Sequence, residues 1–244
     1  MGSPNTVKLY PYAGLGHADH GWLDARHHFS FARYWNPDRV GFGTLLVIND
    51  DKIQAGRGFA PHGHDNMEII TYVRSGGISH RDSMGNEGRT GAGDVQVMSA
   101  GSGVTHSEVN LEDTDTTLYQ IWITPNQKNV APRWDAKQFP QGVVTNALPL
   151  LVSGQPEHKD KGALFIYQDA AIYGGRLTNG TNIPQNIKHQ AYILASRGAF
   201  DITTPDGKTI SLYQGDGAEI IGFKDFTITA KDDCEILVID VPAD

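Results

Sequence analysis

The sequence predicts an all-β protein, and three observations support this prediction. Short runs rich in Val, Ile, Thr and Tyr recur along the chain of 244 residues. Its 28 glycines and 12 prolines are spread among these runs, as turns between short strands require. No long stretch has apolar residues at helical spacing. Together these features are typical of an antiparallel barrel or sandwich.

Eight runs are predicted to be strands, because each is rich in β-branched or aromatic residues and is bounded by turn residues. Four of them fall in the first half of the chain and four in the second. They cover residues 43–49, 67–73, 94–98, 117–124, 192–195, 209–213, 226–230 and 235–241.

The two halves repeat one turn pattern, which predicts an internal duplication. Three pairs of glycines keep an offset of 122 residues (198 − 76, 207 − 85 and 215 − 93): Gly76 with Gly198, Gly85 with Gly207, and Gly93 with Gly215. Between the halves, residues 125–162 are polar and dotted with prolines, as in a connecting segment. We therefore expect an N-terminal metal-binding domain over 1–130, and a linker with a C-terminal domain over 131–244.

Two short motifs carry the candidate chemistry, Pro61-His62-Gly63-His64 and Thr105-His106-Ser107-Glu108. Each holds two metal-capable side chains one residue apart. On a strand such side chains point to the same face, roughly 6.5–7 Å apart, so both can reach one ion. Two such pairs facing each other would form a site of three histidines and one carboxylate.

The spacing leaves the identity of the carboxylate open. Glu68 lies an even number of residues from His62 and His64, and shares their face if the strand is regular. Either Glu68 or Glu108 is therefore a candidate ligand, with the other supporting the site or structural. Three imidazoles and a carboxylate leave open positions on an octahedral ion, which suits Fe(II) oxygen chemistry. Mn, Ni, Cu, Zn or Co can bind the same donors.

The second half lacks these donors. At the offset of 122, the positions that match the four candidate ligands hold Pro184, Asn186, Ile228 and Ala230. His189 alone cannot rebuild the site, so we expect a C-terminal domain without metal ligands.

The remaining histidines are assigned to packing or to turns. Four of them lie in an N-terminal segment beside Trp22 and Phe29, which favours structural packing: His17, His20, His27 and His28. His80 adjoins Arg81 and is expected in a polar turn.

Composition narrows the class of protein. The formal net charge of −8 disfavours direct nucleic-acid binding, because phosphates repel an acidic surface. A single cysteine, Cys234, excludes an intrachain disulfide and fits a reducing compartment. Residues 1–6 lack the apolar core of a secretory signal, and no apolar run is long enough to cross a bilayer. We therefore expect a cytoplasmic protein without direct contacts to membrane or nucleic acid.

Several motifs together resemble the pirin family. The opening resembles it in Gly-Trp-Leu-Asp (21–24), His-Phe-Ser-Phe (28–31) and Val-Ile-Asn-Asp-Asp (47–51). The resemblance continues in Pro-His-Gly-His (61–64), Met-Glu-Ile-Ile-Thr-Tyr-Val (67–73), His-Arg-Asp-Ser-Met-Gly-Asn (80–86), Ala-Gly-Asp-Val-Gln (92–96), Met-Ser-Ala-Gly-Ser-Gly (98–103) and Thr-His-Ser-Glu (105–108). This block covers most of the first half, and the second half is similar in pattern only.

The resemblance implies a bicupin, that is, two antiparallel β-barrel (jelly-roll) domains in one chain. It implies one divalent transition metal, with Fe(II) expected, in the N-terminal cupin alone. The family's ligand roles fall on His62, His64, His106 and Glu108, so the resemblance favours Glu108 over Glu68. Gly63 departs from the proline that many pirins have between the two histidines.

The resemblance also implies an activity. Bacterial pirins of this type are similar to quercetin 2,3-dioxygenases, which open flavonols with O2 and release carbon monoxide. In that hypothesis Glu108, or Glu68, accepts the proton of the substrate hydroxyl. Eukaryotic relatives act as transcriptional cofactors, so a non-enzymatic, redox-sensing protein that binds a protein partner is the alternative. Another cupin activity, such as an isomerase, is a third hypothesis.

Overall fold

In the computed structural model, which describes residues 5–243, nearly all regular structure is β-strand. The helices in this range are the single 3-10 turns Tyr12–Gly14 and Pro156–His158, and neither has the length or apolar character to span a bilayer. The all-β prediction is therefore confirmed. The N-terminal pattern over 1–6 falls mostly outside the described residues.

The described chain divides into two units. The N-terminal unit comprises residues 16–140 and 164–168, and the C-terminal unit comprises 5–15, 141–163 and 169–243. The first strand, β1 (Thr6–Tyr10), pairs with β20 (Gly217–Ile221) and so belongs to the C-terminal unit. The short strand β14 (Leu164–Phe165) belongs to the N-terminal unit. The division expected at residue 130 did not anticipate that β1 belongs to the C-terminal unit or that β14 belongs to the N-terminal unit. Strands of two to five residues are too short for a hydrophobic pattern to assign them to a unit.

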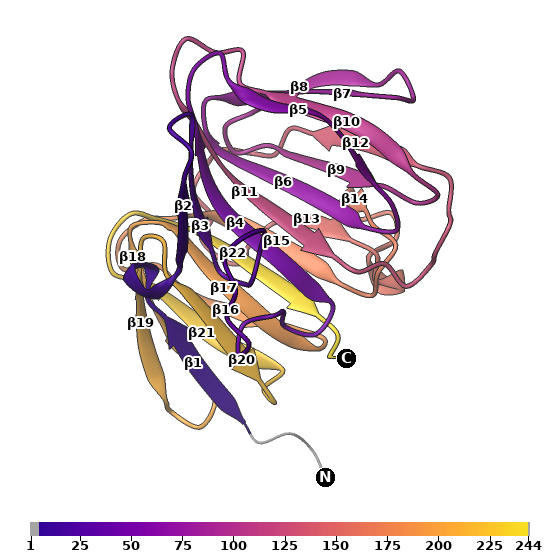
Figure 1. Cartoon of the computed structure of the whole chain (residues 1–244). Coiled ribbons are helices and arrows are strands. Elements are labelled where there is room, and N and C mark those ends of the chain that lie inside the picture. Colours follow the sequence, from indigo (N-terminus) through magenta and orange to yellow (C-terminus); the bar gives the residue numbers. More distant parts are fainter. Residues whose placement is uncertain (1–4, 244) are drawn as a thin grey trace. The chain divides into compact units, whose positions relative to one another are not determined.

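The N-terminal unit is built from two facing antiparallel sheets (Figure 1). The larger sheet has the order β12-β9-β6-β11-β4-β3-β2. Its strands are β2 (Gly16–Asp19), β3 (Leu23–His27), β4 (Leu45–Ile53), β6 (Glu68–Ser75), β9 (Val95–Ser99), β11 (Thr116–Ile123) and β12 (Arg133–Lys137). The smaller sheet has the order β5-β10-β7-β8. Its strands are β5 (Gly58–His64), β7 (Gly77–Asp82), β8 (Glu87–Gly91) and β10 (Val104–Val109). Both sheets stay open, so the unit is a jelly-roll-like sandwich and not a closed barrel.

The C-terminal unit repeats this strand order. Within this unit, the strands of the larger sheet follow the order β1-β20-β17-β22-β15-β13, and those of the smaller sheet the order β16-β21-β18-β19. The strands not yet given are β13 (Leu150–Ser153), β15 (Ala171–Leu177), β16 (Asn182–Asn186), β17 (Gln190–Arg197), β18 (Ala199–Thr203), β19 (Thr209–Tyr213), β21 (Asp225–Ala230) and β22 (Cys234–Val241). All six repeated turn glycines have positive φ, which confirms the turn pattern of the duplication.

The interior of the C-terminal unit is filled by apolar side chains. Ile228 and Ala230 occupy the positions that match His106 and Glu108, and both lie in one buried cluster with Ile183. The same sandwich therefore has a hydrophobic core where the N-terminal unit carries polar side chains.

All eight predicted strands are present, with ends that differ by a few residues. The strands that sequence patterns missed include β5, whose residues GFAPHGH contain few strand formers. In strand β10, buried residues alternate with more exposed ones. The side chains of Val104, His106 and Glu108 therefore all point into the sandwich.

Candidate metal centre

Three histidines gather on the inner face of the smaller sheet. His62 and His106 are direct partners in the β5–β10 ladder, and their Nε2 atoms lie 3.1 Å apart. His64 is two residues along β5 on the same face, opposite Val104. Ring nitrogens of the three histidines all lie within 4.8 Å of one another. The structure therefore brings together the three histidines that the two motifs predicted.

The protonation of these rings fits a metal. Burial, with the neighbouring His62 next, lowers the pKa of His64 to about 4 and that of His106 to about 3. Both rings are therefore neutral at pH 7 and have a lone pair available for coordination. His62 donates Nδ1–H to the Ala60 carbonyl at 2.8 Å, and its Nε2 atom faces His106. A backbone carbonyl on the other ring nitrogen is the usual support of a metal-binding imidazole.

Glu108 lies farther along β10, beyond a register shift between His106 and Glu108. Its carboxylate is buried and points at the larger sheet. Gln96 Nε2 donates to Oε1 at 2.7 Å, and Gln120 Nε2 donates to Oε2 at 2.8 Å. The Thr71 hydroxyl lies 3.1 Å from Oε1. Desolvation by burial raises the pKa of Glu108 above its ordinary value, against these hydrogen bonds.

The donors to Glu108 are part of a polar row that crosses the larger sheet. Register pairs join His27 to Asn49, Asn49 to Gln120, Gln120 to Thr71, and Thr71 to Gln96. Paired positions share a face, so five strands place polar side chains on the side that faces the smaller sheet. Sequence spacing could not reveal this row, because its members lie at least 22 residues (49 − 27) and up to 93 residues (120 − 27) apart along the chain.

His80 is the residue that sequence reasoning missed. It lies in strand β7 and not in a turn, is buried, and is the register partner of Glu108. Its Nδ1 is 3.5 Å from His106 Nδ1, and its Nε2 is 3.1 Å from Asp82 Oδ2. Its ring stacks on Trp134 with centroids 4.9 Å apart. His80, His106 and Glu108 form a second group with donor atoms within 4.8 Å.

Glu68 lies in a separate environment. It begins β6, opposite Ser99, whose hydroxyl donates to Oε2 at 2.7 Å. Burial raises the pKa of Glu68 to about 7. It does not line the cavity described next, and it is absent from both groups of candidate metal donors.

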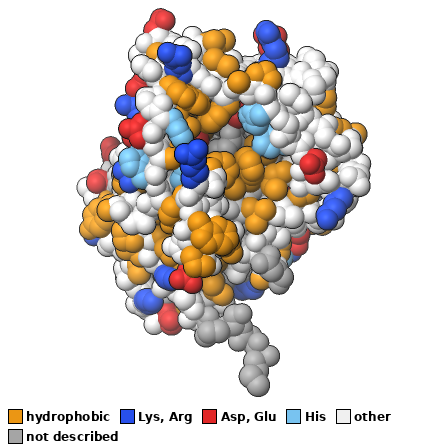
Figure 2. Space-filling model, viewed as in Figure 1, with side chains coloured by type: hydrophobic (Ala, Val, Ile, Leu, Met, Phe, Trp, Pro, Cys, Tyr) orange, Lys and Arg blue, Asp and Glu red, His pale blue; other side chains and the backbone are white. Residues whose placement is uncertain are grey.

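A cavity of about 1040 Å³ opens beside the histidines in the N-terminal unit. Its lining includes His62, His64, His106 and Glu108, and aromatic side chains such as Trp22, Phe59 and Trp122. Figure 2 shows histidine and hydrophobic side chains around a hollow in the visible face. His17, His20 and His27 also line the cavity, so three of the four histidines assigned to packing have access to the site. His28 is buried outside the lining, as the packing assignment expected.

Comparison with known proteins places the chain in a family. Residues 10–123 match the family described as Pirin, and residues 150–241 match the one described as Quercetinase C-terminal cupin domain. The chain is 45% identical to "Pirin-like protein" of Caulobacter vibrioides, over 94% of this chain and 97% of the relative. It is 40% identical to "Quercetin 2,3-dioxygenase" of Escherichia coli strain K12, over 93% and 95%.

A solved structure agrees over the full length. The bacterial pirin YhhW of Escherichia coli, in complex with nickel(II), superposes with a TM-score of 0.87 at 38% identity, covering 98% of this chain and all of that one. With the two family matches and the repeated jelly-roll architecture, these similarities show that the chain belongs to the pirin family of bicupins.

Proposed function

We propose that the protein is a metal-dependent dioxygenase that cleaves flavonols such as quercetin with O2 and releases carbon monoxide. The observation that carries the proposal is a cluster of three histidines opening onto a large, partly aromatic cavity. The relative named quercetin 2,3-dioxygenase supports the reaction class. We further propose His62, His64, His106 and Glu108 as the metal ligands and Fe(II) as the native ion.

In this proposal the histidines bind the metal, and Glu108 accepts a proton from the substrate. A bound divalent ion would act as a Lewis acid that lowers the pKa of a coordinated substrate hydroxyl. His62, His64 and His106 would hold this ion from the smaller sheet, and the cavity that they line offers room for substrate and O2. Glu108 is suited to receive the hydroxyl proton, because burial raises its carboxyl pKa.

The cavity walls suit a planar aromatic substrate. Trp22 and Phe59 meet edge to face with centroids 5.3 Å apart, and Trp122 packs edge to face on His64 at 5.0 Å. Flavonol rings can pack against such surfaces, and the apolar lining excludes water from reactive species.

Carbon monoxide release from quercetin by iron- or manganese-loaded protein tests the proposal. We expect steady release, and loss of both metal and activity in His62→Ala and His106→Ala. His189→Ala, in the C-terminal unit, is the matched control and should retain activity. Absence of turnover by fully loaded protein would refute the enzymatic proposal. Tight metal binding without turnover is the result expected of the non-enzymatic, redox-sensing alternative.

A further inference from the structure

Two adjacent acids in β4 differ in their partners. Asp50 pairs with Arg74 inside the protein. Asp51 is only 3% exposed and lines the cavity, and its Oδ1 atom has no hydrogen-bond partner among the described residues. A buried polar atom without a partner lowers stability, so its presence in a cavity wall points to a ligand that supplies the missing hydrogen bond.

The register partners of Asp51 are apolar. Its register partners are Ala25 in β3 and Leu118 in β11, and both belong to a buried hydrophobic cluster. Trp22 and Phe59 pack against that cluster and also line the cavity. The Asp51 carboxyl therefore lies between the polar row through Asn49 and Gln120 and an apolar, aromatic part of the wall.

This environment favours the neutral form of the Asp51 carboxyl. Desolvation, followed by the nearby charges of Asp50 and Glu108, raises the pKa of Asp51 well above its ordinary value. A neutral carboxyl offers one O–H donor and acceptor oxygens, and has little attraction for a cation. Arg33 and Arg57 also line the cavity and would repel a cationic ligand. The group that fits is a neutral hydroxyl on an apolar ring.

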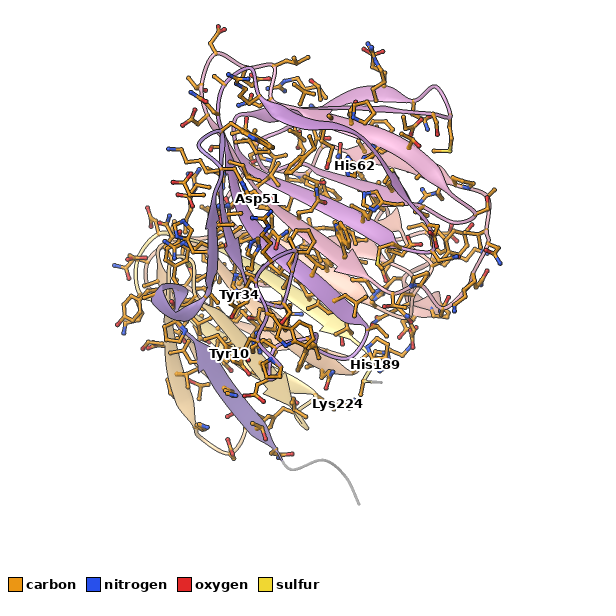
Figure 3. All side chains as sticks on the ribbon, viewed as in Figure 1. Tyr10, Tyr34, Asp51, His62, His189 and Lys224 are labelled. Carbon is orange, nitrogen blue, oxygen red and sulfur yellow. The ribbon has the colours of Figure 1, made fainter. Side chains whose placement is uncertain are left out.

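We propose that Asp51 is a specificity-determining residue, which hydrogen-bonds a phenolic hydroxyl of the substrate on a ring remote from the metal-chelating group. Asp51 comes from β4 of the larger sheet, whereas the histidine cluster lies on the smaller sheet, as the labels Asp51 and His62 show in Figure 3. A volume of about 1040 Å³ accommodates a multi-ring molecule reaching both. The inference rests on the proposed function, because that function gives the chemical class of the ligand. Its test requires only that the ligand bind, and not that it be turned over.

Anaerobic binding to the metal-loaded protein tests this inference, with quenching of tryptophan fluorescence as the signal. The probes are quercetin and 3-hydroxyflavone, which keeps the chelating hydroxyl and lacks the remote ones. In Asp51→Leu the preference for quercetin over 3-hydroxyflavone should fall by about tenfold or more relative to the wild type. Asp51→Ala should show the same loss without filling the space. Asp51→Asn retains a donor and an acceptor, and should keep most of the preference.

Thermal unfolding gives an independent readout. Asp51→Leu should raise Tm, because it replaces an unpartnered buried carboxyl with an apolar side chain beside Leu118. A purely structural Asp51 would instead give a lower Tm in Asp51→Leu. An unchanged preference in both Asp51→Leu and Asp51→Ala, or loss of the preference in Asp51→Asn, overturns the inference. Because no turnover is needed, a protein that discriminates the probes without releasing carbon monoxide refutes the proposed function alone.

Discussion

Gln120 donates its side-chain amide to Glu108 Oε2 at 2.8 Å, from the sheet that faces the one carrying Glu108. Gln96 holds the other carboxylate oxygen from the same sheet at 2.7 Å. The position of the candidate carboxylate ligand is thus determined by two amides from β9 and β11, and not by its own strand alone.

Removing this support should weaken metal binding. Gln120→Ala leaves Oε2 without its amide donor and frees the Glu108 side chain to rotate, so we expect metal affinity to fall about 10- to 100-fold. Competition with a chromophoric chelator measures it. Gln185→Ala, at a buried glutamine of the C-terminal unit, is the control and should bind metal as the wild type does. Equal affinities in all three proteins would show that the amide has no positioning role.

Isosteric substitution can show which of the two candidate carboxylates, Glu108 or Glu68, is the metal ligand. Glu108→Gln removes the charge next to His106 and should reduce metal affinity strongly. Glu68→Gln should leave it unchanged, because Glu68 does not line the cavity and its Ser99 partner can donate equally well to an amide oxygen. Metal titration of both variants decides the matter. Loss of binding in Glu68→Gln alone would reverse the assignment.

Glu68→Gln should also change the pH dependence of stability. The carboxyl has a folded pKa of about 7 against an ordinary value of 4.5, so the folded state binds more protons between these values. Stability therefore falls as pH rises from 4.5 to 7 and stays lowered above. In Glu68→Gln this decline should disappear. Urea unfolding at pH 5 and pH 8 measures it, and an unchanged difference between the two pH values contradicts the prediction.

His28 should make the protein less stable as the pH falls, which is the opposite of the pH dependence expected for Glu68. Burial, with the charge of Arg39 next, lowers the pKa of His28 from 6.5 to about 3. The unfolded chain then binds more protons, so stability falls as pH drops from 6.5 toward 3. The contribution is on the order of 3 kcal/mol between pH 7 and pH 4. In His28→Leu the free energy of unfolding, measured by urea denaturation, should depend less on pH between pH 7 and pH 4. In His20→Leu, at an exposed position, it should not, and an equally strong pH dependence in His28→Leu would argue against the prediction.

Two glycines of β5 provide a matched pair for backbone effects. A Cβ at Gly58 would collide with the Glu108 carbonyl and the Val109 backbone, so Gly58→Ala should displace β10. We expect losses of stability and of metal affinity. At Gly63 the nearest atom to an added Cβ is the Val104 carbonyl oxygen at 3.9 Å, and φ is not positive. Gly63→Ala should therefore stabilise the protein by about 0.4–1 kcal/mol. Chemical denaturation distinguishes the two, and similar effects at both positions would contradict this reading.

The three histidines were predictable because their geometry is local. Residues one apart on a strand share a face whatever the rest of the fold does, so each pair could be recognised from its own motif. That the pairs would face each other required only that β5 and β10 be neighbours, which the register of His62 with His106 now shows.

His80 and Asp51 illustrate what local pattern cannot supply. His80 looked like part of a polar turn, because Arg81 and Ser83 follow it. Its burial results from pairing with Glu108 across β7 and β10. Asp51 directly follows Asp50 in the sequence, and only the structure shows that Asp50 pairs with Arg74 whereas Asp51 Oδ1 has no hydrogen-bond partner among the described residues.

The sequence by itself determined the all-β class, the duplicated halves and the residue types of the candidate centre, since each follows from periodicities that a strand imposes on its own residues. Tertiary structure decided that Glu108, and not Glu68, lies near His106, that Asp51 Oδ1 has no hydrogen-bond partner among the described residues, and that β1 completes the C-terminal unit. These outcomes depend on strand register between segments far apart in the chain, and register is set by the packing of one whole sheet face against another.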